Sequence, residues 1–224
     1  MEVSMGRPIR SEPYDLGAAV KAEAWKLITE QGVEAVALRA VARALHITAP
    51  AIYNYFPSRE ELLKALVEDA DADLGRYLTE AHAPHLQDDP GVQFRVVCQA
   101  YRRWAMENPQ RYMLFFALPA IEEASVSHTL QSLIAILHYA HTHGGLKREQ
   151  GLVFPPGLSK LLSEWKVKFG VEEEYVLYLA FIVWSRLHGL ILNEIGKRHP
   201  PYIKDAGELF RLEVKTMIFQ YFSA

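Results

Sequence analysis

The residues best suited to chemistry gather in one run near the N-terminus, LRAVARALHITAPAIYNYFPSREE at positions 38–61. No acidic side chain lies between Glu34 and Glu60. The same interval holds three arginines, Arg39, Arg43 and Arg59. Guanidinium groups bind phosphate oxygens through paired hydrogen bonds, and a surface that meets phosphates must exclude carboxylates. The run therefore predicts a phosphate-binding surface. This surface must be narrow, because residues 1–66 as a whole are not basic: they carry eight basic and eight acidic side chains.

Two short helices must position these side chains. Apolar residues at the spacing of one buried helical face mark the first: Leu38, Val41, Ala42 and Leu45. The period breaks at His46 and Ile47, and Thr48 is then a suitable N-cap for a second helix with proline in its first turn. Pro57 stops this helix, and Ser58-Arg59-Glu60-Glu61 is a capping box for a third. A short helix, a tight turn and a second helix with a small, polar N-terminal end predict a helix-turn-helix.

A helix-turn-helix enters DNA through its second helix, here about residues 49–55. Ala49, Pro50 and Ala51 are expected to face base edges, where they can contact thymine methyl groups but form no paired hydrogen bonds. Base discrimination is therefore expected mainly from DNA shape and from three polar side chains, Arg39, Thr48 and Asn54.

Contacts to the DNA backbone are expected from three further residues, Tyr53, Tyr55 and Arg59. Ile52 and Phe56 already take the core-facing side of the second helix, which leaves both tyrosines free to reach phosphates. The alternative is that the tyrosines are partly buried aromatic side chains.

The run resembles the DNA-binding region of the tetracycline-repressor (TetR) family of bacterial transcription regulators. The resemblance depends on the spacing from Ala42 through Thr48 to Tyr53, on the aromatic run that ends at Phe56, and on the Ser-Arg-Glu-Glu-Leu that follows. Two residues depart from the family pattern. His46 stands where the family usually has Gly; histidine tolerates left-handed geometry, so the turn is expected to keep its shape with some strain. Ala37 stands where the family often has Ser or Thr, which removes one phosphate-contacting hydroxyl.

The predicted fold is all-α, with a three-helix DNA-binding head at residues 1–57 and a ligand-binding and dimerisation body at residues 58–224. Residues 1–13 are expected to form a flexible arm, which could also reach a minor groove through Arg7 and Arg10. Further helices are predicted at about 15–31, from Ser58 to about 83, at 90–107, from 109, from Pro119 to about 143, at 158–169, at 172–197 and from 205 to 222. The resemblance implies that the helix from Ser58 links head and body and transmits a ligand signal by its tilt.

The helices at about 172–197 and 205–222 carry apolar residues on more than one face. Such helices need more than one partner. The resemblance implies that they pair with their mates in a homodimer. Gly189 would then allow two helix backbones to approach closely.

Aromatic residues gather in the body, as core or as the lining of an apolar pocket for a small apolar or aromatic effector. The resemblance implies an effector pocket in this region. The candidate ligand-binding residues are Tyr101, Trp104, Tyr112, Phe115, Phe116, His138, Trp165, Trp184 and His188. No cofactor is expected.

Several function classes are not supported by the sequence. Common nucleophile, metalloprotease, Walker and Rossmann signatures are absent. Asp71 and Asp73 lie two residues apart on a helix, so they point to different faces and cannot act together as an acid–base pair. His138, His141 and His143 are interpreted as a helix end rather than a metal site. No apolar run reaches the ~20 residues that span a bilayer, and no signal core precedes the head, so a cytoplasmic protein without membrane contact is expected. Cys98 is expected to be buried.

Together these features predict a homodimeric DNA-binding regulator of a palindromic operator, most simply a repressor released by a ligand. Two alternatives stay open. One is a regulator or activator without an effector, whose body serves for dimerisation or for docking another protein through the 144–170 segment. The other is a helical small-molecule carrier or enzyme whose head has lost DNA binding.

Overall fold

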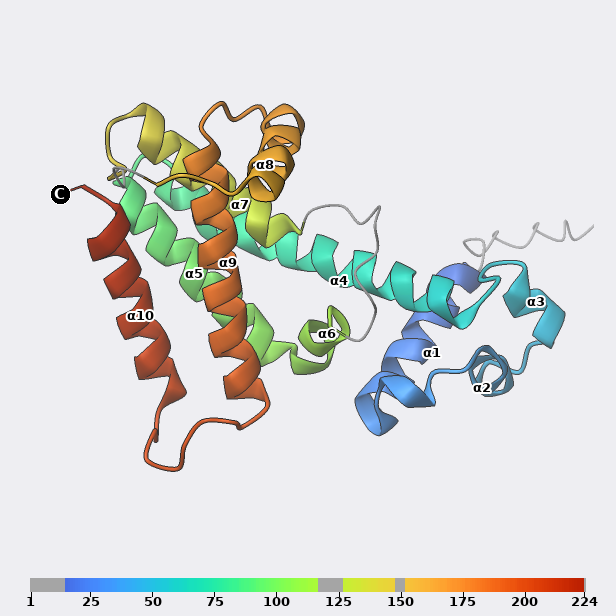
Figure 1. Cartoon of the computed structure of the whole chain (residues 1–224). Coiled ribbons are helices and arrows are strands. Elements are labelled where there is room, and N and C mark those ends of the chain that lie inside the picture. Colours follow the sequence, from blue (N-terminus) through green and yellow to red (C-terminus); the bar gives the residue numbers. More distant parts are fainter. Residues whose placement is uncertain (1–14, 117–126, 148–151, 224) are drawn as a thin grey trace, which may run out of the picture. The chain divides into compact units, whose positions relative to one another are not determined.

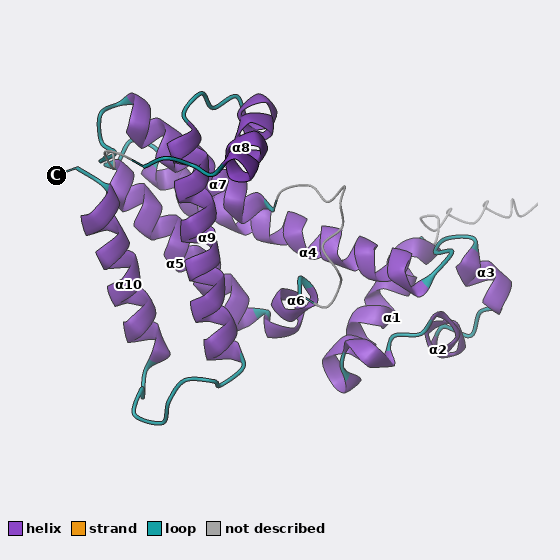
Figure 2. Cartoon of the chain, viewed as in Figure 1, coloured by secondary structure: helices purple, strands orange, loops and turns teal. Residues whose placement is uncertain are grey.

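The computed structural model describes residues 15–116, 127–147 and 152–223. Within these ranges all regular elements are helices (Figures 1 and 2), apart from a single antiparallel bridge between Leu146 and Phe222. The prediction of an all-α fold is confirmed. The arm predicted at residues 1–13 lies outside the described residues.

The chain divides into two compact units, Met1–Val67 and Glu68–Ala224, here called the head unit and the body unit. The division falls inside α4 (Arg59–His82). Leucines of the first turns of α4 are buried: Leu62, Leu63 and Leu66. The start of this helix therefore belongs with the head unit, ten residues beyond the division at 57/58 that the sequence suggests.

The remaining helices of the head unit are short. They are α1 (Leu16–Gln31), the 3-10 turn η1 (Val33–Ala35), α2 (Leu38–Ala44) and α3 (Ala49–Tyr53). Asp15 caps α1 by accepting a hydrogen bond from the Ala18 amide at 3.0 Å, and Gly32 ends the helix with a φ of 88°. Thr48 occupies the N-cap position of α3, but its side chain makes no capping hydrogen bond, contrary to the expectation from its residue type.

The turn between α2 and α3 is closed by the backbone. His46 has a φ of 55°, the left-handed geometry that its replacement of glycine predicted. The Ile47 amide donates to the Ala42 carbonyl at 3.0 Å, and the His46 amide to the Arg43 carbonyl at 3.2 Å. Ile52 is fully buried, which fixes the face that α3 turns toward the core.

The body unit continues α4 and adds, within the described residues, six α-helices and one short 3-10 turn. They are η2 (Ala83–His85), α5 (Pro90–Glu107), α6 (Pro109–Leu114), α7 (His128–Thr142), α8 (Pro156–Phe169), α9 (Glu174–Ile195) and α10 (Ala206–Tyr221). Asp89 and Asp205 cap α5 and α10 through backbone amides at 2.8 and 2.7 Å. The expected start at Pro119 lies outside the described residues; α7 begins at His128, because the extended Ser127 caps it.

The core of the body unit surrounds α5 and α9. Helix α9 packs against α5, α7, α8 and α10 (Figure 1). The inward face of α5 is at most 1% exposed at all five residues expected there: Phe94, Val97, Cys98, Tyr101 and Trp104. Burial raises the pKa of the Cys98 thiol well above its ordinary value, which keeps it protonated.

Helix α9 is long and apolar. Within its 22 residues an 18-residue window has a mean hydropathy of 1.6, enough to cross a membrane by length and composition alone. It contains no uninterrupted apolar run of ~20 residues, because Arg186 and His188 interrupt it. A helix in the core of a bundle passes the same test, and the four helices packed around α9 agree with that interpretation.

The positive φ of His46 generates a prediction about stability. Replacing His46 by Gly should leave the protein more stable than replacing it by Ala, by about 0.5–1 kcal/mol, because only glycine adopts this geometry without steric cost. Urea unfolding followed by circular dichroism measures the difference. At Lys26, an exposed position within α1, the order should reverse, with Ala more stable than Gly by about 1 kcal/mol. The same order at both positions would contradict the strain assigned to the turn.

Candidate functional site

The exposed side of the helix-turn-helix carries most of the residues predicted to bind DNA. Arg39, Thr48, Pro50, Tyr53, Asn54 and Tyr55 are exposed, whereas Ala49, Ala51 and Arg59 are half-buried. Tyr53 is 42% exposed and Tyr55 52%, while Ile52, directly before Tyr53, is buried, as the helical period requires. The ring of Tyr55 also lies against the first turn of α1, since a Cβ added at Gly17 would meet it at 3.4 Å. Both hydroxyls remain available to phosphates.

Arg59 differs from the other arginines of the head unit. Its Nε donates to the Val36 carbonyl at 2.7 Å and its Nη2 to the Val33 carbonyl at 2.8 Å. These carbonyls lie at the two ends of η1, on its first residue and on its C-cap, so Arg59 ties the start of α4 to the segment before α2. The geometry assigns this side chain a structural role first, which the sequence could not show because the partners lie 23 and 26 residues away.

The second set of candidates forms a continuous cluster of rings in the body unit, here called the aromatic cluster. His188 lies at its centre, with Trp184, Tyr101, Tyr112 and Phe116 at ring distances from 4.2 to 5.7 Å. Phe115 extends the cluster from Tyr112 to Trp104, whose ring it stacks on at 6.0 Å. The structure thus brings together residues of α5, α6 and α9 that the sequence proposed separately.

Two candidates lie further out. Trp165 on α8 reaches the aromatic cluster through Phe181, which the sequence analysis did not select as a ligand residue, at 6.1 Å, and Phe181 then stacks on Trp184 at 5.9 Å. His138 joins by no ring contact within the described part of the chain, and its buried Nδ1 has no hydrogen-bond partner there. Neighbouring His141 lies 3.7 Å from Glu173. Within the described ranges no group of three or more His, Cys, Asp or Glu side chains could hold a metal ion.

Hydrogen bonds order the centre of the aromatic cluster. The hydroxyls of Tyr112 and Tyr101 lie 2.7 and 2.9 Å from His188 Nδ1. Burial lowers the pKa of His188 from its ordinary value of 6.5 to about 3 and raises the pKa of Tyr101 and of Tyr112. All three groups are therefore neutral near pH 7. Below pH 6.5 His188 becomes protonated in the unfolded chain, whereas in the folded chain it stays neutral down to about pH 3. The folded state therefore loses stability as the pH falls from 6.5 toward 3.

Two carboxylates of α4 connect this helix to the rest of the body unit. Asp73 accepts hydrogen bonds from Trp104 Nε1 and from Arg111 Nη1, both at 3.1 Å. Asp71 accepts from the His128 amide at 3.2 Å, and its Oδ2 lies 2.6 Å from His128 Nδ1. Because the two aspartates are two residues apart, they point to different sides of α4. This prevents them from acting as an acid–base pair and lets them contact different helices.

Glycine completes the contact at α7. A Cβ at Gly75 would lie 2.5 Å from His128 Cδ2, so the imidazole rests directly on the α4 backbone. Sequence reasoning missed His128 and Arg111; the available signal was a mid-helix glycine one turn after an aspartate.

A helix-turn-helix with an exposed, carboxylate-free face, followed by a helical body with its own core, defines a DNA-binding regulator of the two-part helical class. Family models agree over both parts. The model for bacterial regulatory proteins of the tetR family matches residues 22–66, and the model for the tetracyclin repressor-like C-terminal domain matches residues 94–217. The chain belongs to the TetR family and is a transcriptional regulator rather than an enzyme.

Individual relatives share this architecture. The HTH-type transcriptional regulator Rv1816 of Mycobacterium tuberculosis is 26% identical over 200 residues, covering 85% of this chain and 86% of that protein. The crystal structure of the regulatory protein SCO4313 is 25% identical, with a TM-score of 0.67 over 90% of this chain and 94% of that one. A TetR variant from Acinetobacter baumannii AYE, solved in complex with minocycline, shares the fold with a TM-score of 0.58 at 18% identity, covering 93% of this chain and 96% of that one.

The contacts of Arg59 predict that it stabilises the head unit. Replacing Arg59 by Gln should lower the free energy of unfolding by about 1.5–3 kcal/mol, because two charge-assisted hydrogen bonds are lost and two carbonyls lose their donor. Arg43, which is exposed, is the matched control, and Arg43→Gln should change stability by less than about 0.5 kcal/mol. Urea unfolding and amide hydrogen exchange in residues 33–36 report both effects. Equal free energies of unfolding for the two variants would contradict the structural role assigned to Arg59.

Proposed function

We propose that this chain is a repressor that binds a roughly palindromic operator as a homodimer and is released from it by a small apolar or aromatic effector. Membership of the TetR family supports the DNA-binding part. Release by an effector is supported by the hydrogen bond between Trp104 of the aromatic cluster and Asp73 of α4. The protein would act in the cytoplasm.

DNA binding would use the exposed side of α2 and α3. The small first turn of α3 can approach base edges, with Ala49, Pro50 and Ala51 against thymine methyl groups. Thr48 and Asn54, one at each end of α3, and Arg39 on α2 supply polar contacts, and the two exposed tyrosines supply phosphate contacts. Because α3 has no side chain for a paired hydrogen bond to guanine, the shape of the DNA should contribute much of the specificity.

Dimerisation would use α9 and α10. On α9, four residues at four-residue spacing are exposed: Phe181, Ser185, Gly189 and Asn193. A Cβ at Gly189 would meet nothing within 4 Å, so no neighbour in the described part of the same chain explains this mid-helix glycine. On α10, Leu212 is 62% exposed and Phe219 80%. In the DNA-binding state of the dimer, the two copies of α3 would need to lie about 34–36 Å apart to enter successive major grooves.

Effector binding would use the aromatic cluster. Tyr101, Trp104 and Tyr112 are at most 1% exposed, so an effector must displace or part these rings. One donor is available for it, because the buried Trp184 Nε1 has no hydrogen-bond partner within the described residues. An unpaired buried N–H costs about 1–3 kcal/mol, which an acceptor on the effector would recover. The expected effector is therefore an apolar or aromatic molecule with a carbonyl or hydroxyl oxygen.

Release would pass through α4. An effector that moves the Trp104 ring also moves the N–H that Asp73 accepts. On the opposite side Asp71 and His128 hold α4 to α7, so the helix would tilt about one fixed contact. Such a tilt can lower DNA affinity only if the effector binds the tilted state more tightly.

One observation favours a second candidate, a regulator that uses its body to dock another protein. Val153 is 85% exposed and Val167, on α8, 88%. Exposed apolar side chains in the predicted 144–170 docking segment would suit a protein partner, although scattered single ones are common on surfaces. A compound screen separates the candidates, because only the effector-released repressor requires a stabilising small molecule.

The test of DNA binding is selection of duplexes from a random pool by the full-length protein. A palindromic winner whose affinity falls steeply with salt supports the proposal. If unfolding and refolding, to strip any bound ligand, still enrich no sequence, DNA recognition by this chain is excluded.

With the selected duplex, Arg39→Ala and Tyr53→Ala should each weaken binding by about 5- to 150-fold, the effect of losing about 1–3 kcal/mol of contact energy. Arg39→Ala should also lower the salt slope by about one if it contacts a phosphate. Tyr202→Ala, an exposed tyrosine of the body unit, is the control and should bind like the wild type. Fluorescence anisotropy at several salt concentrations measures all three. If Arg39→Ala and Tyr53→Ala both bind DNA as tightly as the wild type, another surface of the protein binds DNA.

Coupling through α4 gives a separate prediction. A compound that stabilises the protein in a thermal-shift screen should weaken operator binding by about 5- to 150-fold in the wild type. In Asp73→Ala the same compound should still bind but change operator affinity by less than about twofold, because the acceptor of the Trp104 N–H is gone. Glu80→Ala, an exposed carboxylate further along α4, should behave like the wild type. Full coupling in Asp73→Ala would rule out this route.

A further inference from the structure

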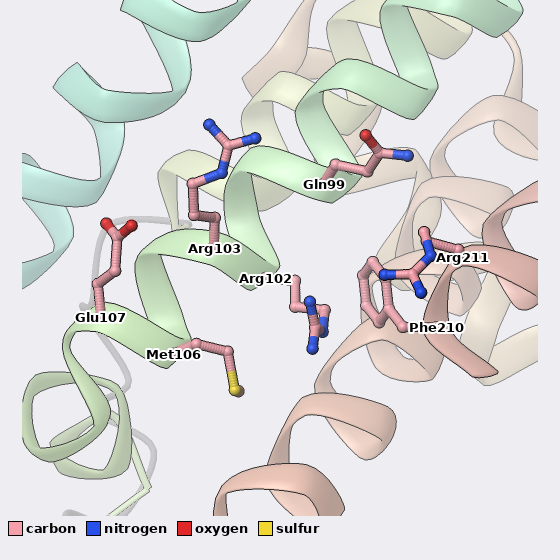
Figure 3. Close-up of a pocket in the computed structure, with 7 residues that line it drawn as sticks. All are labelled: Gln99, Arg102, Arg103, Met106, Glu107, Phe210 and Arg211. Atoms are coloured by element: carbon pink, nitrogen blue, oxygen red, sulfur yellow. The ribbon is translucent and has the colours of Figure 1, made fainter. Parts of the chain in front are cut away.

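An open pocket of about 330 Å³ lies between α5 and α10 (Figure 3). Its lining residues are Gln99, Arg102, Arg103, Met106, Glu107, Phe210 and Arg211. None of them belongs to the aromatic cluster or to the helix-turn-helix. The lining is unusual in its charge, with three arginines against a single glutamate.

Arg102 is fixed in place at the centre of this pocket. Its Nε donates to Glu194 Oε2 at 2.8 Å, and its Nη2 bonds to the other oxygen of the same carboxylate. Its guanidinium carbon lies 5.8 Å from the centre of the Phe210 ring. The hydrogen bond to Glu194 raises the pKa of Arg102 above its ordinary value. A Cβ at Gly207 would lie 2.7 Å from Arg102 Nη2, so a glycine in the first turn of α10 makes room for this side chain.

The other two arginines of the pocket are held less firmly by protein partners. Arg103 is exposed and forms no ion pair within the described ranges. Arg211 reaches Asp205 at 3.3 Å, but both side chains are about half exposed, 53% and 52%. An exposed pair of this kind contributes little and can exchange its partner. In Figure 3 Arg102 and Arg211 lie on either side of the Phe210 ring, whereas Arg103 extends from α5 away from them.

We propose that this pocket binds a small organic anion with one carboxylate and an apolar body. Arginine binds carboxylate oxygens through paired hydrogen bonds. Met106 and Phe210 supply apolar surface beside the charges, and a volume near 330 Å³ suits a small molecule. One negative charge matches the site better than two. Glu194 and Asp205 already pair with Arg102 and Arg211, which leaves Arg103 for the ligand carboxylate, and Glu107 repels a second anionic group.

The proposal is tested by isothermal titration of the full-length protein with phenylacetate, which combines one carboxylate with an apolar ring. Saturable binding at millimolar or lower concentration is expected. Phenylacetamide has the same shape without the charge, and inorganic phosphate has more charge without the ring; both should bind at least about tenfold more weakly.

Variants locate the binding. Arg103→Gln should weaken phenylacetate binding by about ten- to a hundredfold, the effect of one charged hydrogen-bonding group. Arg95→Gln, an exposed arginine on the same helix outside the pocket, is the matched control and should bind like the wild type. Equal binding by both variants would mean that phenylacetate occupies another site, such as the aromatic cluster, and would overturn the proposal. Binding of phenylacetamide or phosphate as tightly as phenylacetate, or the absence of phenylacetate binding, would overturn it as well. None of these measurements uses DNA, so they stand apart from the test of the repressor.

Discussion

A buried indole N–H without an acceptor costs free energy, and the acceptor of the Trp104 N–H is on α4. Trp104 is 1% exposed, and its N–H reaches Asp73 at 3.1 Å. Leaving such a donor unpaired costs about 1–3 kcal/mol, comparable to the whole coupling energy of a typical allosteric regulator. The ring therefore cannot shift far without shifting α4 or losing that energy. One hydrogen bond ties the aromatic cluster to the helix that continues into the head unit.

Local structure was predictable where neighbouring residues decide it. The helices that begin after Asp15, Asp89 and Asp205 start within one residue of the predicted positions, because a cap needs only an acceptor beside free backbone amides. His46 adopts the left-handed geometry expected of a residue that replaces glycine in this turn. Thr48 shows the limit of this reasoning, since its position was predicted correctly while its side chain makes no capping bond.

The contacts that connect elements were not predictable, because their partners lie far apart in sequence. Asp73 and Trp104 are 31 residues apart, and Asp71 and His128 are 57 apart. The aromatic residues could be named from composition and family resemblance, but not their order around His188, which depends on how α5, α6 and α9 pack. Arg59 was expected to bind phosphate because its charge suited the run, whereas the fold gives it two backbone carbonyls. Charge in a sequence shows what a side chain can bind and not which partner is nearer.

The centre of the aromatic cluster would suit an apolar effector better than an ionic one. His188, Tyr101 and Tyr112 are all kept neutral by burial, so the cluster offers no charge to pair with. An ion entering it would lose its hydration without gaining a counter-charge, which costs several kcal/mol. The arginines lie instead around the pocket between α5 and α10, where solvent reaches them. The body unit thus separates an apolar, hydrogen-bonding interior from a cationic surface pocket, and molecules of different polarity should partition between the two.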